Sequence, residues 1–179
     1  MKLRPLKKIL RKGFIKINLM ILTGAPGSGK STWANQQKNA KVISRDVIRF
    51  SLLSDEDEYF SKEDEVLKLF YKSIQEALDA TNVDYDTVIA DASHLTSVRR
   101  YETLRELNLD NVNEIINVQF ITPVDVCIAR NANRTGRANV PNDVIKRMRK
   151  SQIMTQPHES FTRTIVVNER GEMNDIFHK

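Results

Sequence analysis

Eight consecutive residues of this chain have the types and the spacing of a phosphate-binding loop. They follow the pattern G-x-x-x-x-G-K-[ST] and come directly after an apolar stretch, residues 17–23, which predicts a buried strand. Glycines let successive backbone N–H groups turn toward phosphate oxygens, because no Cβ stands in the way. We expect this segment and the next residue to bind a nucleoside triphosphate: Gly24, Ala25, Pro26, Gly27, Ser28, Gly29, Lys30, Ser31 and Thr32.

Two side chains at the end of this segment add specific chemistry. Lys30 is predicted to reach the β- and γ-phosphates as a catalytic residue, and Ser31 is predicted to offer its hydroxyl to Mg²⁺. A helix over residues 31 to about 38 would direct the partial positive charge of its N-terminus at the same phosphates.

Asp46 is the candidate general base of a transfer reaction. It follows a short predicted strand, Val42-Ile43, which places its carboxylate at the same sheet edge as the phosphate-binding loop. There it could accept a proton from an attacking hydroxyl, or it could only cap the helix that begins near Val47. Arg49, one helical turn later, could hold an anionic group of the acceptor.

The remaining motifs separate classes of nucleotide-binding proteins. The guanine signature N-K-x-D is absent, and Asp91 after the strand 88–90 is followed by Ala92 rather than by a second acid. A small domain without either feature is expected to transfer phosphate to a bound acceptor rather than to hydrolyse it. Asp91 could bind Mg²⁺ through water, position the acceptor or only complete a loop. We place it with Asp46 and Arg49 among the substrate-binding candidates.

A polar segment with three arginines, residues 130–137, is predicted to form a mobile lid over the phosphates. Guanidinium groups suit phosphoryl oxygens better than ammonium groups do, and an arginine at the transferring phosphate stabilises the transition state. We therefore predict that Arg130 and Arg134 bind the nucleotide and that Arg134 is catalytic. A solvated basic helix end is the alternative for this segment.

Length and charge favour one domain of 15–179 preceded by a basic arm over residues 1–14. The chain has 179 residues and a net charge of +5, but residues 1–16 carry seven Lys or Arg and no acid, so the remainder carries −2. The arm could be flexible, could contact nucleic acid or a membrane surface, or could be a simple extension. The longest apolar run is too short for a membrane span, which favours the cytoplasm. Cys127 is expected in the core.

Strand and helix signals alternate along the chain, which favours crossover connections and a parallel sheet. We expect a three-layer α/β P-loop NTPase fold of about five strands, with ligands at the carboxyl ends of the strands. Ser61 is the candidate N-cap of one helix. After the phosphate-binding loop and its helix, the predicted strands are 42–43, 88–90, 115–121 and 165–167, and the predicted helices are 61–80, 96–107, 124–131 and 141–154.

This ordered set of residues resembles the small P-loop kinases grouped around the 5′-hydroxyl kinase domain of phage polynucleotide kinase and the zeta-toxin-like kinases. The matching residues span about 17–168 and are Gly24 to Ala34, Arg45-Asp46 with Arg49, Asp91, Arg130 with Arg134, Val140-Pro141, Val144-Ile145 and Arg147-Met148.

The resemblance implies ATP and Mg²⁺ as cofactors and assigns three roles. The residue matching Asp46 is the general base on the 5′-hydroxyl, the one matching Arg134 contacts the transferring phosphate, and the one matching Arg49 binds a substrate phosphate. The chain departs from the family pattern at two points. Val47 stands after Asp46 in place of a second acidic residue, and the sequence after Asp91 is Ala-Ser-His. It also has no counterpart of the phosphatase domain.

The sequence thus predicts a kinase whose leading acceptor is the 5′-hydroxyl end of a polynucleotide. A nucleoside or small metabolite is the alternative acceptor. The alternative from another functional class is a regulatory module that binds a nucleotide and transfers no phosphate.

Overall fold

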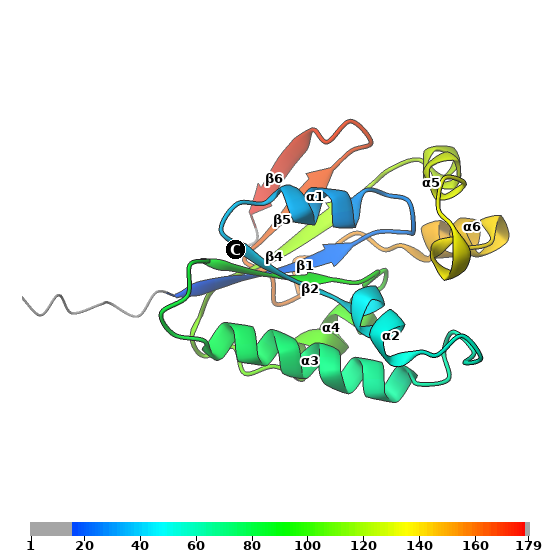
Figure 1. The fold of residues 1–179 in the computed structure, drawn as a ribbon. Coiled ribbons are helices and arrows are strands. Elements are labelled where there is room, and N and C mark those ends of the chain that lie inside the picture. The colour runs from blue at the N-terminus through cyan, green and yellow to red at the C-terminus, as the bar shows by residue number, and fades with distance from the viewer. Residues whose placement is uncertain (1–15, 178–179) are drawn as a thin grey trace, which may run out of the picture.

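A six-stranded sheet forms the centre of the computed structural model, which describes residues 16–177 (Figure 1). The strand order is β2-β3-β1-β4-β5-β6. The first five strands are parallel, and β6 runs antiparallel to β5. The bounds are β1 Ile17–Thr23, β2 Ala40–Ser44, β3 Thr87–Asp91, β4 Val112–Phe120, β5 Arg163–Val167 and β6 Met173–Phe177. The predicted three-layer fold is confirmed, whereas the predicted basic arm lies outside the described residues.

Helices cover both faces of this sheet. Figure 1 shows α3 and α4 on one face, α1 on the other, and α5 and α6 beyond the carboxyl ends of the parallel strands. The bounds are α1 Lys30–Gln36, α2 Arg45–Leu52, α3 Glu63–Asp79, α4 Ser97–Arg105, α5 Val124–Asn131, the short 3₁₀ helix η1 Gly136–Ala138, and α6 Asn142–Ser151.

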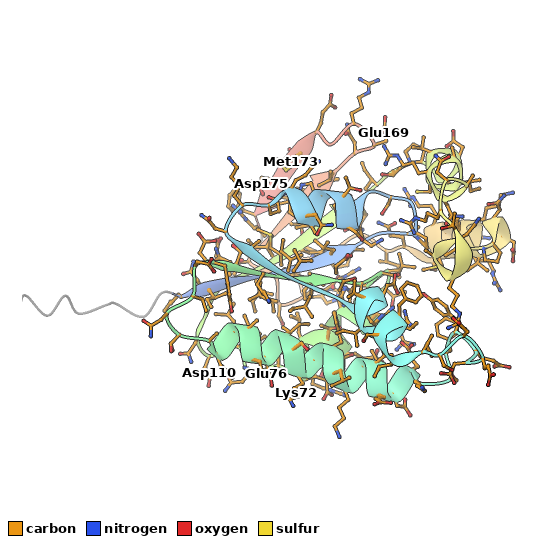
Figure 2. All side chains as sticks on the ribbon, viewed as in Figure 1. Lys72, Glu76, Asp110, Glu169, Met173 and Asp175 are labelled. Carbon is orange, nitrogen blue, oxygen red and sulfur yellow. The ribbon has the colours of Figure 1, made fainter. Side chains whose placement is uncertain are left out.

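Strand alternation divides the core between the two faces. In β1, Leu19 and Ile21 pack in the cluster beneath α3, while Leu22 packs in the cluster beneath α1. All five residues of β3 are buried, as expected for a strand covered on both faces. The helix α3 turns Phe70 and Ile74 inward, whereas Lys72 and Glu76 point away from the sheet (Figure 2).

Two features of the elements differ from the sequence predictions. Ser61 is not the N-cap of α3, because the helix begins at Glu63 after Lys62 and the Ser61 hydroxyl donates to the Glu58 carbonyl at 2.8 Å. The strand β6 was not predicted: every one of its residues is exposed, so it lacks the apolar alternation that marks a strand. Between residues 16 and 177, no helix has the length and apolar character needed to cross a membrane.

The strand order decides which segments meet at the carboxyl edge. The segment after β2 lies beside the end of β3, because Ser44 pairs with Asp91 in register. The loop after β1 comes next, followed by the segments after β4 and β5. The phosphate-binding loop is therefore flanked by α2 on one side and by α5 and the β5–β6 turn on the other.

Candidate active site

The phosphate-binding loop connects β1 to α1 as predicted. Gly27 and Gly29 have φ angles of 77° and 103°, a region in which side chains other than glycine are strained. The Lys30 ammonium bends back and donates to the Ala25 carbonyl at 3.0 Å, and burial lowers the pKa of Lys30. The Gly24 N–H donates to the Ser93 carbonyl at 2.9 Å, which ties the loop to the segment after β3.

The loop also packs tightly against α5. Cys127 of that helix is buried, as predicted, and its backbone lies directly against Gly27. A Cβ at position 27 would lie 2.2 Å from the Cys127 carbonyl oxygen. No room for a side chain exists at this point of the loop.

Ser31 and Asp91 lie side by side next to the loop. The Ser31 hydroxyl donates to Asp91 Oδ2 at 2.7 Å, and the Asp91 side chain is buried. Burial raises the pKa of Asp91, although the Lys30 charge and the Ser31 hydrogen bond oppose the rise. A hydroxyl and a carboxylate are hard oxygen donors of the kind that Mg²⁺ prefers. All three roles considered for Asp91, in magnesium binding, acceptor binding and loop structure, stay predictions.

Asp46 lies in the first turn of α2 and has partners other than the helix backbone. The Ser44 hydroxyl accepts the Val47 N–H at 3.5 Å, so Ser44 and not Asp46 is the N-cap. Asp46 Oδ1 accepts hydrogen bonds from Arg49 Nη1 at 2.5 Å and from the Tyr59 hydroxyl at 3.3 Å. The interpretation of Asp46 as a helix cap is therefore wrong.

Arg49 is held from several directions. Its side chain is 2% exposed, Nη2 donates to Glu63 Oε2 at 2.6 Å, and its guanidinium carbon lies 4.7 Å from the centre of the Tyr59 ring. Two carboxylates and an aromatic ring thus fix the guanidinium beside Asp46. Its role as a ligand of an acceptor phosphate stays a prediction.

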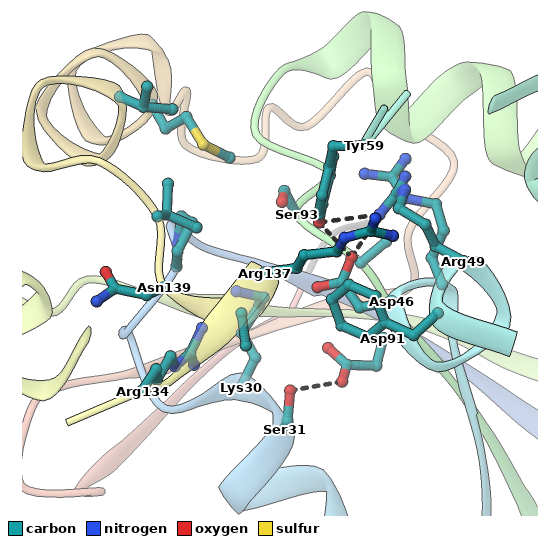
Figure 3. Close-up of a pocket in the computed structure, with 18 of the residues that line it drawn as sticks. Lys30, Ser31, Asp46, Arg49, Tyr59, Asp91, Ser93, Arg134, Arg137 and Asn139 are labelled. Carbon is teal, nitrogen blue, oxygen red and sulfur yellow. Dashed lines mark hydrogen bonds and ion pairs between the residues drawn. The ribbon is translucent and has the colours of Figure 1, made fainter. Parts of the chain in front are cut away.

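A cavity of about 470 Å³ joins these groups (Figure 3). Lys30, Ser31 and Asp91 line its phosphate-loop side, and Asp46 and Arg49 line the α2 side. Its other walls are largely apolar. Three aromatic residues come from α2 and the segment after it, and four aliphatic residues come from α6 and the segment before it: Phe50, Tyr59 and Phe60, and Val140, Pro141, Val144 and Met148.

The segment predicted to be a lid crosses this cavity between α5 and α6. Arg134 lines the cavity and is exposed, and its positive charge acts on both Lys30 and Asp91. Arg137 Nη2 donates to the carbonyl oxygens of Asp55 at 2.7 Å and Asp57 at 2.9 Å. The segment is thereby attached to the loop between α2 and α3. Its mobility stays a prediction.

Arg130 lies on the opposite side of the phosphate-binding loop. Its Nη1 donates to the Ser28 carbonyl at 3.5 Å, and its Nη2 donates to the Glu169 carbonyl at 2.7 Å. A second cavity, of about 320 Å³, opens here between the start of α1 and the β5–β6 turn; Thr32 and Trp33 line one side of it, and residues 168–171 line the other. The phosphate-binding loop therefore separates two cavities.

Comparison with protein families gives a match over most of the chain. The sequence pattern of the AAA domain family AAA_33 matches residues 19–154. This range includes the phosphate-binding loop, the carboxylates of Asp46 and Asp91, and the arginines of the lid segment. The chain belongs to this family. The match places this AAA domain among P-loop kinase domains, as the sequence resemblance predicted.

Solved structures share the fold of this AAA domain at low sequence identity. A Pnkp1/Rnl/Hen1 RNA repair complex matches with a TM-score of 0.63 and 21% identity over 94% of this chain, which spans 50% of the matched chain. An unliganded sugar kinase from Janibacter sp. HTCC2649 has a TM-score of 0.58 and 19% identity over 87% of each chain. Kti12 from Chaetomium thermophilum, in complex with ADP-AlF3, has a TM-score of 0.56 and 18% identity over 84% of this chain and 88% of its own.

His94 is a structural residue of the AAA domain. It is buried behind the end of β3, where Nδ1 donates to the Leu22 carbonyl at 2.9 Å and Nε2 accepts from the Thr103 hydroxyl at 3.1 Å. Burial lowers its pKa from 6.5 to about 3. The imidazole is therefore neutral in the folded chain at physiological pH.

The buried imidazole predicts that stability falls on the acid side of neutrality. Between pH 6.5 and about 3 the unfolded chain binds a proton at His94 that the folded chain excludes. The unfolding free energy therefore decreases as pH falls through this window, by up to about 1.4 kcal/mol per pH unit from this group. Urea unfolding at several pH values measures the slope. His94→Asn, which suits the positive φ of 40°, is expected to show a shallower slope; parallel slopes would contradict the assignment.

Several residues of the larger cavity were missed by the sequence predictions. The segment between α2 and α3 and the start of α3 carried no site prediction, yet Glu63 binds Arg49 and the aromatic rings of Tyr59 and Phe60 line the cavity. Adjacent aromatic residues inside an acidic segment were the available signal, because solvated loops rarely carry them. Arg45, next to Asp46, also lines the cavity.

Proposed function

We propose that this chain is an ATP- and Mg²⁺-dependent kinase that transfers the γ-phosphate to the 5′-hydroxyl end of a polynucleotide. The observation that carries the proposal is the position of Asp46, which lines the same cavity as Lys30 and Ser31 while the second cavity lies across the phosphate-binding loop. One cavity suits the base of the donor, and the other suits an acceptor next to the terminal phosphate.

The groups around the larger cavity match the needs of phosphoryl transfer. Asp46 accepts the proton of the acceptor hydroxyl. The oxygen of that hydroxyl forms a bond to the γ-phosphorus, while the bond between the γ-phosphorus and the bridging oxygen, which leaves with ADP, breaks. Lys30 and Arg134 stabilise the negative charge on the transferring group. Ser31 and Asp91 would hold Mg²⁺, which would supply further positive charge to the donor phosphates.

The walls of the cavity support a nucleoside unit as acceptor. Aromatic side chains from the α2 side face aliphatic side chains from the α6 side, and a nucleobase has two flat apolar faces that fit between such surfaces. The similarity in fold to a chain of an RNA repair complex agrees with this acceptor.

A small-molecule acceptor is the second candidate, and one observation favours it. Four consecutive acidic residues, 55–58, lie in the loop that Arg137 attaches to the lid segment, next to the cavity. Their charge repels the phosphates of a long polynucleotide and has no such effect on an uncharged sugar. The similarity in fold to a sugar kinase agrees with this candidate.

A transfer assay with γ-labelled ATP and Mg²⁺ tests the proposal. The acceptors are DNA and RNA oligonucleotides with a 5′-hydroxyl, the same oligonucleotides with a 5′-phosphate as matched controls, nucleosides, and small sugars. We expect label on the 5′-hydroxyl oligonucleotides alone, with a loss of about 10³-fold in Arg134→Ala, because that arginine neutralises transition-state charge.

Each other outcome has a distinct meaning. Label on small molecules only would overturn the polynucleotide acceptor and support the second candidate. Tight nucleotide binding without label on any acceptor would overturn transfer and support a regulatory module.

A further inference from the structure

The hydroxyl of Tyr59 lies between two charged side chains of α2 that line the larger cavity (Figure 3). It accepts a hydrogen bond from Arg49 Nη1 at 3.3 Å and donates one to Asp46 Oδ1 at 3.3 Å. An arginine can only donate, so the single proton of the hydroxyl is left for the carboxylate. Burial, followed by the charge of Asp46, raises the pKa of Tyr59, which keeps this proton in place.

These contacts distinguish the two oxygens of the Asp46 carboxylate. Oδ1 accepts from both Arg49 and Tyr59, whereas Oδ2 accepts no hydrogen bond from any residue that the structure describes. The Asp46 side chain is 63% exposed, so little packing holds its rotamer. Its orientation therefore depends on the donors that bind Oδ1, and Oδ2 is the oxygen left for an acceptor hydroxyl.

The loop between α2 and α3, which carries Tyr59, is cross-linked within itself. Asp57 Oδ2 accepts from the Ser54 N–H at 2.8 Å and from the Ser54 hydroxyl at 2.9 Å, and it pairs with the Lys62 ammonium at 2.9 Å. Lys62 also donates to the Leu52 carbonyl at 2.7 Å. These bonds enclose Tyr59 in the sequence, so we expect a displacement of Asp57 to be passed on to Tyr59.

The lid segment holds this loop at residues close to Tyr59. Arg137 Nη2 binds the carbonyl oxygens of Asp55 and Asp57, four and two residues before Tyr59. The same segment carries Arg134, which lines the cavity. A continuous chain of contacts therefore runs from the lid segment through the loop to the carboxylate on α2.

We propose that Tyr59 is a positioning residue for Asp46 and that Arg137 acts through it, so that the lid segment orients the catalytic base. The inference rests on the proposed function, in which Asp46 takes the proton of the acceptor hydroxyl. The hydrogen bond from Tyr59 to Asp46 is about 0.5 Å longer than is usual between two oxygens, so a small shift of the loop strengthens or breaks it. Engagement of the transferring phosphate by Arg134 would thereby reach the base through Arg137 and Tyr59.

A double-mutant cycle of Tyr59→Phe and Arg137→Gln tests the linkage through transfer kinetics. Tyr59→Phe removes the hydroxyl and keeps the ring, whose centre lies 4.7 Å from the Arg49 guanidinium carbon. Arg99→Gln is the matched control for the loss of one positive charge, because Arg99 is exposed on α4 and pairs with Glu102. Transfer of label gives kcat and the KM of the acceptor, while calorimetry with ADP and urea unfolding report on folding.

We expect Tyr59→Phe to lower kcat about 10-fold, the lower end of the range for a hydrogen bond to a charged group, and to leave KM within about threefold. Arg137→Gln should lower kcat by no more than Tyr59→Phe does, and by less than about twofold when Tyr59 is already Phe. Arg99→Gln should match the wild type. An unchanged kcat in either single variant, or losses that multiply in the double variant, would overturn the inference.

A second measurement examines the linkage without any transfer step. In protein labelled with ¹³C at tyrosine Cζ, the chain has four such carbons, and the resonance of Tyr59 is the one missing from Tyr59→Phe. Asp46→Asn changes the partner of the hydroxyl and should shift this resonance. Arg137→Gln should shift it in the same direction, and Arg99→Gln should not.

The resonance also separates the linkage from the proposed function. No shift in either variant, or a shift in Asp46→Asn alone, would overturn the linkage. A shift that depends on Arg137, in a chain that transfers phosphate to no acceptor, would instead overturn the proposed function and leave the linkage standing.

Discussion

Replacing Asp46 by Asn is expected to lower kcat for phosphate transfer by about 10²- to 10⁴-fold, the range of a general base. The amide has nearly the shape of the carboxylate but cannot take the proton from the acceptor hydroxyl. ADP affinity should stay within about threefold of the wild type, because Asp46 lies on the α2 side of the cavity. Transfer of label to the best acceptor and calorimetry with ADP measure the two effects.

The pair between Asp46 and Arg49 requires a matched control. Glu63→Gln removes the other carboxylate partner of Arg49 and leaves Asp46 unchanged. If Asp46 acts as the base, Glu63→Gln should lower kcat much less than Asp46→Asn does. Equal losses in the two variants would show that the ion-pair network, and not proton transfer, explains the effect. An Asp46→Asn variant with nearly wild-type kcat would exclude Asp46 as the base.

Gly27→Ala is expected to abolish nucleotide binding and to lower the unfolding free energy by more than about 2 kcal/mol. The new Cβ would lie 2.2 Å from the Cys127 carbonyl oxygen, and the backbone has a φ of 77°. The obstacle is the backbone of α5, which cannot rotate aside as a side chain can. Either the phosphate-binding loop or α5 must therefore shift. Urea unfolding and calorimetry with ADP measure the two losses.

Gly171→Ala is the matched control for Gly27→Ala. It separates the cost of the clash with α5 from the cost of a positive φ angle. Gly171 has a φ of 82°, and a Cβ there would meet no atom within 4 Å. Its variant should lose only about 1 kcal/mol, the cost of the left-handed conformation. Similar losses at positions 27 and 171 would contradict the role of the contact with α5.

The sequence predicted the parallel part of the fold well because local patterns define it. The strand β3 is a run of apolar residues ended by Asp91, and α3 repeats apolar residues at helical spacing, so each could be located without knowledge of its neighbours. The strand β6 has an exposed sequence and depends on pairing with β5. A strand that depends on tertiary pairing of this kind cannot be predicted from a short stretch of sequence.

The candidate site was predictable where a motif fixes it and not where packing does. The motif located the phosphate-binding loop, and the strand ends located Asp46 and Asp91. The partners of Arg49 were not predictable, because Tyr59 and Glu63 reach it only after the chain has turned between α2 and α3.

The attachment of the lid segment to the loop between α2 and α3 is made entirely through the main chain of that loop. Arg137 binds the carbonyl oxygens of Asp55 and Asp57, which every amino acid supplies. The side chains of Asp55 and Asp57 take no part in these two hydrogen bonds, although the Asp57 carboxylate accepts from Ser54 within the loop. In the proposed kinase, acceptor preference and closure of the cavity would therefore be separable traits, and residues 53–60 are the segment in which we expect a new preference to be introduced.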